Sequence, residues 1–246
     1  MKKILLSIAL VVLGTANTLG QTRINKIYDT KSTDELNLIF KYPELVQIRV
    51  WDGKEVKIEG MVNIQDGEFD DNFEIKSSTN GDRFTIESTI KNLENMEGDY
   101  SRQVYDDDST SVTISDKGTR VNLGFRNKRT YKNGVYVSIE LVVTVPQDMK
   151  VTLDARYGLV EVLESPEILE VDARYGGVDV VINESQLLEF DASTQWGQIF
   201  SNLEVPVETD GNDRMGKWMK ASASLKKGEK RLSVESQYGN VYLRKN

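Results

Sequence analysis

The sequence contains one nine-residue stretch twice, as "DARYGLVEV" at Asp154–Val162 and as "DARYGGVDV" at Asp172–Val180. In both copies small or apolar residues alternate with charged ones, which is the pattern of a β-strand with one buried face. An aromatic residue and a glycine interrupt the alternation. Because glycine reaches backbone conformations that are costly for other residues, this pair predicts a sharp corner between two short strands.

The aromatic–glycine pair occurs again further along the chain. Copies at Trp196–Gly197 and Tyr238–Gly239 follow the pair at Tyr175–Gly176, at intervals of 21 and 42 residues, and a shorter match at Met215–Gly216 divides the longer interval. Units of this length that recur along a chain predict a stacked solenoid architecture. We therefore expect residues 146–246 to form a parallel β-helix, or β-solenoid, of about five rungs.

Two of these units are expected to differ from the others in structure. The copy at Met215–Gly216 has polar residues at the earlier positions where the others have apolar ones, so its rung is expected to be irregular or looped out. The final copy, "YGNVYLRKN" at Tyr238–Asn246, is expected to leave an open edge at the end of the stack. Arg244 and Lys245 lie on that edge, where charged side chains discourage edge-to-edge pairing.

The place of a residue in the unit predicts the side of the strand that it faces. Residues two, four and six places before the aromatic residue are small or apolar in the four better copies, and the residue three places after it is apolar. These positions share one face of their strand and are expected to point into the core. The aromatic residues are expected to stack in a column, each covering its neighbour.

The opposite parity gives two outward columns, one with Asp154 and Asp172 and the next with Arg156 and Arg174. These four residues are the candidate binding site, because Arg binds a carboxylate of a glycan or peptide through two parallel hydrogen bonds. In the alternative interpretation the two columns only offset the like-charge repulsion of stacking, which is worth about 0–1 kcal/mol per exposed pair. No catalytic residue and no metal ligand is assigned.

The N-terminal region, residues 21–145, also alternates with a period of two and is expected to be β-rich. Turn dipeptides such as Asp52–Gly53 and Asn80–Gly81 predict antiparallel hairpins there. The polar stretch at residues 92–110 is expected to form a loop. Its Asp106–Asp108 run could bind calcium, but it lacks the alternating ligands of a calcium loop, so an acidic loop tip is the preferred interpretation. The whole chain is thus predicted to be all-β.

The first residues have the layout of a secretory signal peptide, which we place at residues 1–20. Two lysines precede an apolar run at Ile4–Leu13, and small and polar residues follow. Cleavage is expected before Gln21, with the Ala16–Asn17 bond as the second choice. The apolar run is shorter than the roughly 20 residues of a membrane-spanning helix, so no integral membrane segment is expected after cleavage. The sequence therefore predicts export to the periplasm or the cell surface.

The amino-acid composition excludes several kinds of catalytic and ligand-binding site. The chain has no histidine and no cysteine, which excludes Ser-His-Asp and Cys-His nucleophile systems, disulfides and the usual zinc sites. Its formal net charge of -8 argues against nucleic acid, whose phosphates favour Lys and Arg. We expect no cofactor.

Three segments together resemble a known family. They are "LIFKYPELVQIRVWDGKEVKIEG" at Leu38–Gly60, "VYVSIELVVTVPQDMKV" at Val135–Val151 and the recurring YG-x-V-x-V units, all behind a signal peptide. In this order they resemble the putative adhesin β-strand-repeat proteins exported by Gram-negative bacteria, which are head-adhesin-like and often described as domains of unknown function. The resemblance implies a predominantly parallel β-helix-like fold, a periplasmic or surface location and no established catalytic activity. It transfers no site residues.

Two functions follow as hypotheses. The first is a non-enzymatic protein of the cell envelope with an adhesin-like or scaffold role, whose solenoid face binds an envelope protein or a glycan. The alternative is a carbohydrate-active enzyme, a polysaccharide lyase or hydrolase, because parallel β-helices host such enzymes. Asp154 and Asp172 would then be its carboxylate pair, on a flat ladder without an evident cleft.

Overall fold

The computed structural model places most of the chain in β-strands. For residues 100–106, 111–113 and 127–133 it describes the backbone alone. In addition to the strands it contains two short 3-10 helices, η1 (Asp70–Asn72) and η2 (Leu93–Asn95). The described residues are 20–30, 33–98, 100–106, 111–113, 127–210, 218–225 and 228–246.

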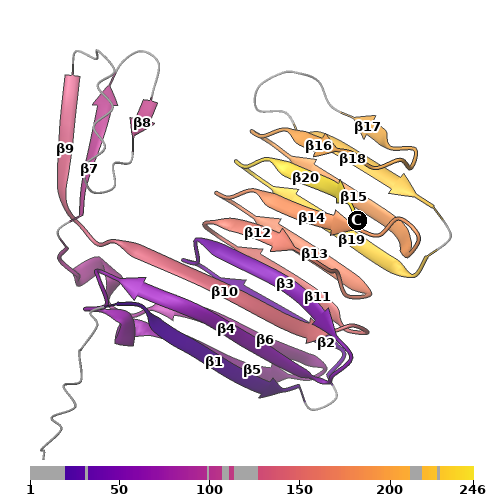
Figure 1. Cartoon of the computed structure of the whole chain (residues 1–246), viewed down its shortest axis with the longest axis horizontal. Helices are drawn as coiled ribbons and strands as arrows, with labels where there is room; N and C mark the ends of the chain where they lie inside the picture. Colours follow the sequence, from indigo (N-terminus) through magenta and orange to yellow (C-terminus); the bar gives the residue numbers. More distant parts are fainter. Residues whose placement is uncertain are drawn as a thin grey trace, which may run out of the picture.

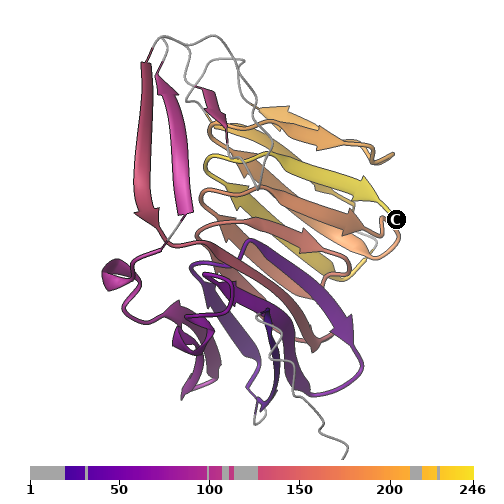
Figure 2. The same cartoon turned by 60° about the vertical axis from the view of Figure 1, so that its left-hand side comes forward.

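Two large sheets and one small sheet make up the fold (Figure 1). In spatial order, the first sheet contains β1 (Thr22–Asp29), β4 (Glu55–Ile64), β10 (Val137–Pro146), β3 (Leu45–Trp51), β12 (Leu159–Val162), β14 (Val178–Ile182), β20 (Val241–Lys245) and β16 (Ile199–Ser201). The second sheet contains β17 (Glu208–Asp210), β18 (Met219–Ser224), β15 (Leu187–Thr194), β19 (Lys230–Ser236), β13 (Ile168–Ala173), β11 (Lys150–Ala155), β2 (Glu35–Phe40), β6 (Arg83–Ile90) and β5 (Phe73–Asn80). The small sheet contains β8 (Ser111–Thr113), β7 (Tyr100–Asp106) and β9 (Asn127–Gly134). It projects from the two large sheets at the upper left of Figure 1, and β7 and β9 are seen on the left in Figure 2.

Both large sheets are mixed, and they do not close into a barrel. Their central strands pair in parallel, whereas the pairs β1–β4, β4–β10, β5–β6, β15–β18 and β17–β18 are antiparallel. The prediction of an all-β chain is confirmed. The hairpin expected at Asn80–Gly81 joins β5 and β6. The turn at Asp52–Gly53 connects β3 to β4 but does not form a hairpin, because β10 lies between these two strands and pairs with both.

Each complete repeat unit contributes one strand to each large sheet. The chain leaves β11 in the second sheet, turns at Tyr157–Gly158 and enters β12 in the first sheet; β13–β14, β15–β16 and β19–β20 are connected in the same way. Equivalent residues pair in register, for example Asp154 with Asp172 and Val160 with Val178. The β2–β3 connection from the N-terminal region stacks beside β11–β12. In both sheets, strands from the N-terminal region therefore pair directly with strands from the repeat region that was predicted to begin at residue 146.

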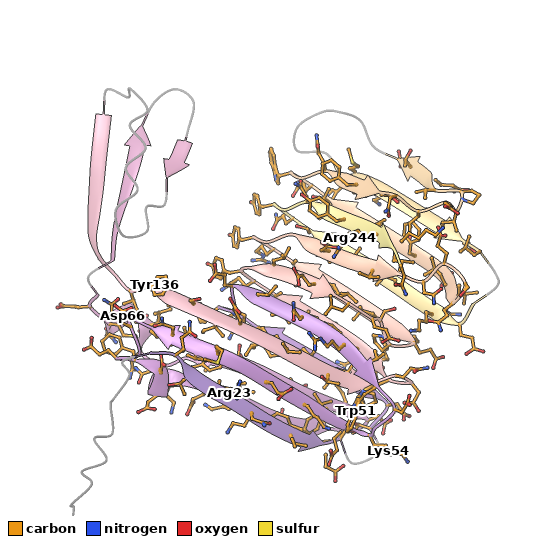
Figure 3. All side chains as sticks on the ribbon, in the orientation of Figure 1. Arg23, Trp51, Lys54, Asp66, Tyr136 and Arg244 are labelled. Atoms are coloured by element: carbon orange, nitrogen blue, oxygen red, sulfur yellow. The ribbon has the colours of Figure 1, made fainter. Side chains whose placement is uncertain are left out.

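The spatial order of the units differs from their order in the chain. The last unit, β19–β20, lies between β13–β14 and β15–β16 in both sheets. The expected open edge at this unit is therefore wrong, since β20 is paired on both sides. Arg244, which is labelled in Figure 3, pairs with Asp179 on the neighbouring strand β14 at 2.6 Å, and Lys245 pairs with Glu204 at 2.8 Å.

The antiparallel hairpin β17–β18 precedes the displaced unit in the chain and covers the other side of β15. It extends the second sheet beyond β15, so the chain that leaves β18 returns to the free side of β15 as β19. Met215–Gly216 lies outside the described residues, but the strands on either side of it do not form a parallel rung. A stack of five parallel rungs in chain order is therefore not the fold of this chain.

The core lies between the two large sheets and matches the predicted inward positions. Val151, Leu153 and Ala155 of the first copy are at most 1% exposed, and their equivalents in the other units are buried as well. Apolar burial of this kind is the main stabilising contribution in a folded domain, at about 25 cal/mol per Å². The outward residues between them are thereby presented on the sheet surface.

Candidate functional site

The corners of neighbouring units pack backbone against backbone. A Cβ atom on Gly176 would lie only 1.4 Å from the carbonyl oxygen of Gly158. Gly158 itself has a φ of +84°, a left-handed conformation that residues with a side chain rarely adopt. The repeat glycines do lie at the corners, but the predicted conformational reason holds only for Gly158. At Gly176, Gly197 and Gly239 the close approach of a neighbouring backbone excludes a side chain instead.

Buried hydroxyl groups hold two of the corners in place. The amide N–H of Gly239 donates to Ser236 Oγ at 2.9 Å, and the Ser236 hydroxyl donates to the carbonyl of Gly176 at 2.7 Å. Thr194 makes the same pair of bonds, with the N–H of Gly197 at 3.1 Å and the carbonyl of Gly239 at 2.8 Å. Each hydroxyl thus closes its own corner and ties it to the adjacent one.

Five aromatic rings stack along the corners and form what we call the aromatic column. Successive ring centroids are 5.1–6.5 Å apart, and neighbouring rings are within 16° of parallel. The predicted stacking is confirmed, but the column lies at the surface, where four of its rings are 44–51% exposed. In spatial order its members are Tyr42, Tyr157, Tyr175, Tyr238 and Trp196.

Tyr42 is the member of this column that the sequence reasoning missed. It lies at the corner between β2 and β3, where Phe40 pairs with Ala155. Pro43 takes the place of the corner glycine, and Phe40 takes the place of the small residue before it. The signal that remains is a basic residue followed by tyrosine, Lys41–Tyr42, as in the two "DARYG" copies.

Polar side chains form a second column immediately beside the rings, the Arg/Gln column. Backbone hydrogen bonds keep it in register, for example from Arg174 N–H to the Ala155 carbonyl at 3.0 Å. Gln237 Nε2 donates to Gln195 Oε1 at 3.3 Å. Among the described residues, the guanidinium groups of Arg156 and Arg174 form no hydrogen bond or ion pair. The members are Arg156, Arg174, Gln237 and Gln195.

A third column, the acidic column, runs parallel to the first two. Asp154 pairs in register with Asp172, and Asp172 with Glu235 on the far side. Ser193 follows Glu235 and donates its hydroxyl to Glu235 Oε2 at 3.4 Å. The structure therefore brings together all four candidate residues of the sequence analysis, Asp154, Asp172, Arg156 and Arg174, on one exposed surface. We call the three columns together the corner face.

The carboxyl group of Asp172 is electrostatically perturbed. Partial desolvation among its neighbours raises its pKa, and repulsion from Asp154 raises it further, while Arg174 acts in the opposite direction. The central carboxylate of the acidic column therefore binds a proton more readily than a solvated Asp does.

A second stacked pair of rings lies away from the corner face, on the first sheet. Phe200 and Tyr242 are 5.2 Å apart, and their side chains are 44% and 37% exposed. Because Phe200 lies on the edge strand β16, this pair continues no further in that direction. The pair offers a matched control for the aromatic column, with similar stacking and exposure at another place.

Within the described ranges no group of three or more His, Cys, Asp or Glu residues is arranged to hold a metal ion. The loop expected at residues 92–110 is wrong in part, because β7 takes up Tyr100–Asp106; the side chains of the acidic run Asp106–Asp108 are outside the described ones. The helices found in the described part of the chain are too short to cross a membrane. The leader expected at residues 1–20 lies outside the described residues except for Gly20.

Comparison with known proteins gave two distant structural matches. No family model and no curated protein sequence matches the chain. A putative cell adhesion protein from Clostridium sporogenes ATCC 15579 is 12% identical with a TM-score of 0.49, covering 92% of this chain and 100% of that one. A putative adhesin from Bacteroides fragilis NCTC 9343 is 8% identical with a TM-score of 0.21, covering 92% and 97%. Identity and TM-score are low in both, so the functional interpretation depends on this chain's own geometry.

Proposed function

We propose that this chain is an exported, non-enzymatic binding protein of the cell envelope, with an adhesin-like or scaffold role, and that the corner face is its binding surface. The observation that carries the proposal is the aromatic column. A soluble protein gains about 25 cal/mol for each Å² of apolar surface that it buries, and a contiguous exposed apolar strip commonly marks an interaction site. Here several half-exposed rings lie in one line.

The polar columns support a binding role in the same place. Arg156 and Arg174 are exposed, and their guanidinium groups form no hydrogen bond or ion pair with a described residue. A guanidinium group whose N–H donors are not hydrogen-bonded within the protein can form paired hydrogen bonds to a ligand. Asp154 and Asp172 add acceptors one column away. We therefore assign these four residues to the proposed site, as in the sequence analysis.

The repeat region and the leader have their own parts in this proposal. Residues 146–246 act as a solenoid-like repeat region whose stacked corners present the binding surface, and residues 21–145 form the β-rich region on which the stack is built. The signal-like layout of residues 1–20 supports export to the periplasm or cell surface. The partner in that compartment is an envelope protein or a glycan.

The experiment compares binding by two forms of the purified mature chain, the wild type and Arg174→Gln. Both are tested against immobilised envelope proteins and polysaccharides of known identity. Because Arg174 is exposed, forms no hydrogen bond or ion pair with a described residue and acts on Asp172 only through its charge, the substitution should change thermal stability little while it weakens binding. Equal binding by two equally stable proteins, across every partner that the wild type binds, would overturn the assignment.

One observation favours a second candidate function, the carbohydrate-active enzyme. Asp154 and Asp172 lie on neighbouring strands, about 5 Å apart, and the raised pKa of Asp172 is a property of a general acid. Incubation with acidic and neutral polysaccharides, with and without calcium, distinguishes the two functions. The binding proposal expects no new reducing or unsaturated ends, whereas turnover that Asp172→Asn abolishes would favour the enzyme.

A further inference from the structure

We infer that the ligand of the corner face is a linear, uncharged polysaccharide of β-1,4-linked pyranose residues that lies along the aromatic column. This inference rests on the proposed function and names the ligand class for that site. The observations behind it are the repeat distance of the column, the hydrogen-bonding groups beside it and the balance of its charges.

The repeat distance selects the kind of polymer. The rings of Tyr157, Tyr175 and Tyr238 are 5.2 and 5.1 Å apart, because each lies at the corner of a different stacked unit. The end intervals, to Tyr42 and to Trp196, are 6.3 and 6.5 Å. A ligand that places one of its residues against each of these rings must advance by about this distance per residue. One residue of an extended β-1,4-linked sugar chain occupies about this length. An extended peptide advances about 3.3 Å per residue, so its side chains on one face recur only every ~7 Å and lose register with the rings.

The hydrogen-bonding groups match a sugar in kind. Because the rings cover one another's faces, the column presents ring edges to the ligand. The phenolic hydroxyl groups of Tyr157, Tyr175 and Tyr238 form no hydrogen bond with a described residue, and each can donate and accept. Sugar hydroxyl groups also donate and accept, so one tyrosine can pair with each successive sugar residue.

The Arg/Gln column supplies planar side chains at the same repeat. A guanidinium group carries parallel N–H donors, and an amide carries a donor and an acceptor side by side. Either can bind two adjacent hydroxyl groups of one sugar ring. Arg156 and Arg174 stand beside the first two rings of the "DARYG" copies, and Gln237 and Gln195 stand beside the next two. At four of the five rings a sugar residue therefore meets one ring and one planar polar side chain, whereas Tyr42 is preceded by Lys41.

The charges favour an uncharged chain over a polyanion. The Arg156 and Arg174 charges are balanced by Asp154 and Asp172 in the adjacent column, and Glu235 adds a further negative charge. The chain as a whole has a formal net charge of -8. A polyuronate would lie beside this row of carboxylates, whereas a neutral glycan can use the same carboxylates as hydrogen-bond acceptors.

The experiment is a calorimetric titration of the full mature chain with β-1,4-linked gluco-, manno- and xylo-oligosaccharides of two to eight residues. Because the column has five rings, affinity for the preferred series should rise with length to about five residues and then level off. Tyr175→Ala should weaken binding at least tenfold. Tyr242→Ala, which removes a ring of similar exposure from the first sheet, should leave affinity unchanged and controls for lost stacking.

Tyr175→Phe removes the hydroxyl group but keeps the ring, so it distinguishes their contributions to binding. It keeps the stack and should weaken binding only several-fold, while a thermal melt verifies that each variant is folded. Failure of every series to bind, preference for polygalacturonate or a peptide, or an affinity that Tyr175→Ala leaves unchanged would overturn the inference. If a protein partner still binds and Arg174→Gln weakens that binding, the proposed function stands without the glycan. If no partner is sensitive to Arg174→Gln, the proposed function itself fails.

Discussion

Tyr175 stacks on Tyr238 at a centroid distance of 5.1 Å, although the whole Trp196 unit lies between them in the chain. The contact exists because the last unit enters both sheets between the second and third units. This insertion places Tyr238 between Tyr175 and Trp196 and makes the aromatic column continuous. The topology of the C-terminal segment therefore creates the surface to which we assign binding.

The close packing of the corners gives the first prediction. Gly176→Ala should lower the free energy of unfolding by about 3 kcal/mol or more, because the added Cβ would meet the Gly158 carbonyl and force the corners apart. Urea unfolding of both proteins measures the difference. Gly81→Ala is the control, since Gly81 has a φ of +60° but open space around it, and should cost only about 1–2 kcal/mol. Equal losses would mean that the corners do not pack as described.

The hydroxyl contacts of Ser236 give the second prediction. Ser236→Ala should destabilise the fold by about 1–3 kcal/mol, because it leaves the Gly239 N–H and the Gly176 carbonyl without their buried partner. Ser233→Ala, on the exposed face of the same strand, should change stability by less than about 0.5 kcal/mol. Thermal or urea unfolding of the two variants tests the contrast, and a neutral Ser236→Ala would contradict the assigned bonds.

The perturbed carboxyl group gives a prediction about pH. The pKa of Asp172 is higher in the folded chain than its ordinary value of 3.8, so its ionised form disfavours the folded state at neutral pH. This destabilisation is relieved as the pH falls through the folded pKa. Asp172→Asn should therefore stabilise the protein at pH 7, by less than about 1 kcal/mol because solvent screens the group. The gain should disappear below pH 3.8.

Unfolding of both proteins across this pH range provides the measurement. A variant that is less stable than the wild type at pH 7 would contradict the account. So would a stability difference that does not change with pH, since that would not arise from ionisation of Asp172.

The proposed export predicts the N-terminus of the mature chain, which can be tested without knowing the ligand. The chain recovered from the cell envelope should begin at Gln21, or at Asn17 if the second-choice bond is cleaved. Intact-mass measurement and N-terminal sequencing distinguish these products. A chain that retains Met1, or that is found in the cytoplasm alone, would contradict export through the leader.

The strands, the inward residues and the corners could be predicted because they depend on local patterns. Val151, Leu153 and Ala155 face inward by strand alternation alone. The order of the units could not be predicted in this way, because their inward positions are so similar that each unit can pair with any other. The antiparallel hairpin β17–β18 precedes the displaced unit, and it lies where the repeat pattern is weakest.

Part of the candidate site could also be predicted from local strand patterns. The parity of the strands gave the columns of Asp154, Asp172, Arg156 and Arg174. The exposure of the aromatic rings could not be predicted in this way. The rings lie at corners, where the alternation of inward and outward residues along a strand ends. Tyr42 was missed because Pro43 and Phe40 replace the glycine and the small residue of the repeat.

The position of the last unit decides whether the corner face is continuous, and cysteine cross-linking tests it directly. The chain has no native cysteine, so an introduced pair reacts alone. Asp172 and Glu235 are in-register neighbours, whereas Asp172 and Ser193 lie two strands apart, about 10 Å. A disulfide joins Cα atoms at roughly 4.4–6.8 Å. The Asp172→Cys/Glu235→Cys variant should therefore oxidise readily and the Asp172→Cys/Ser193→Cys variant should not. The reverse result would show that the units stack in chain order and would contradict the account.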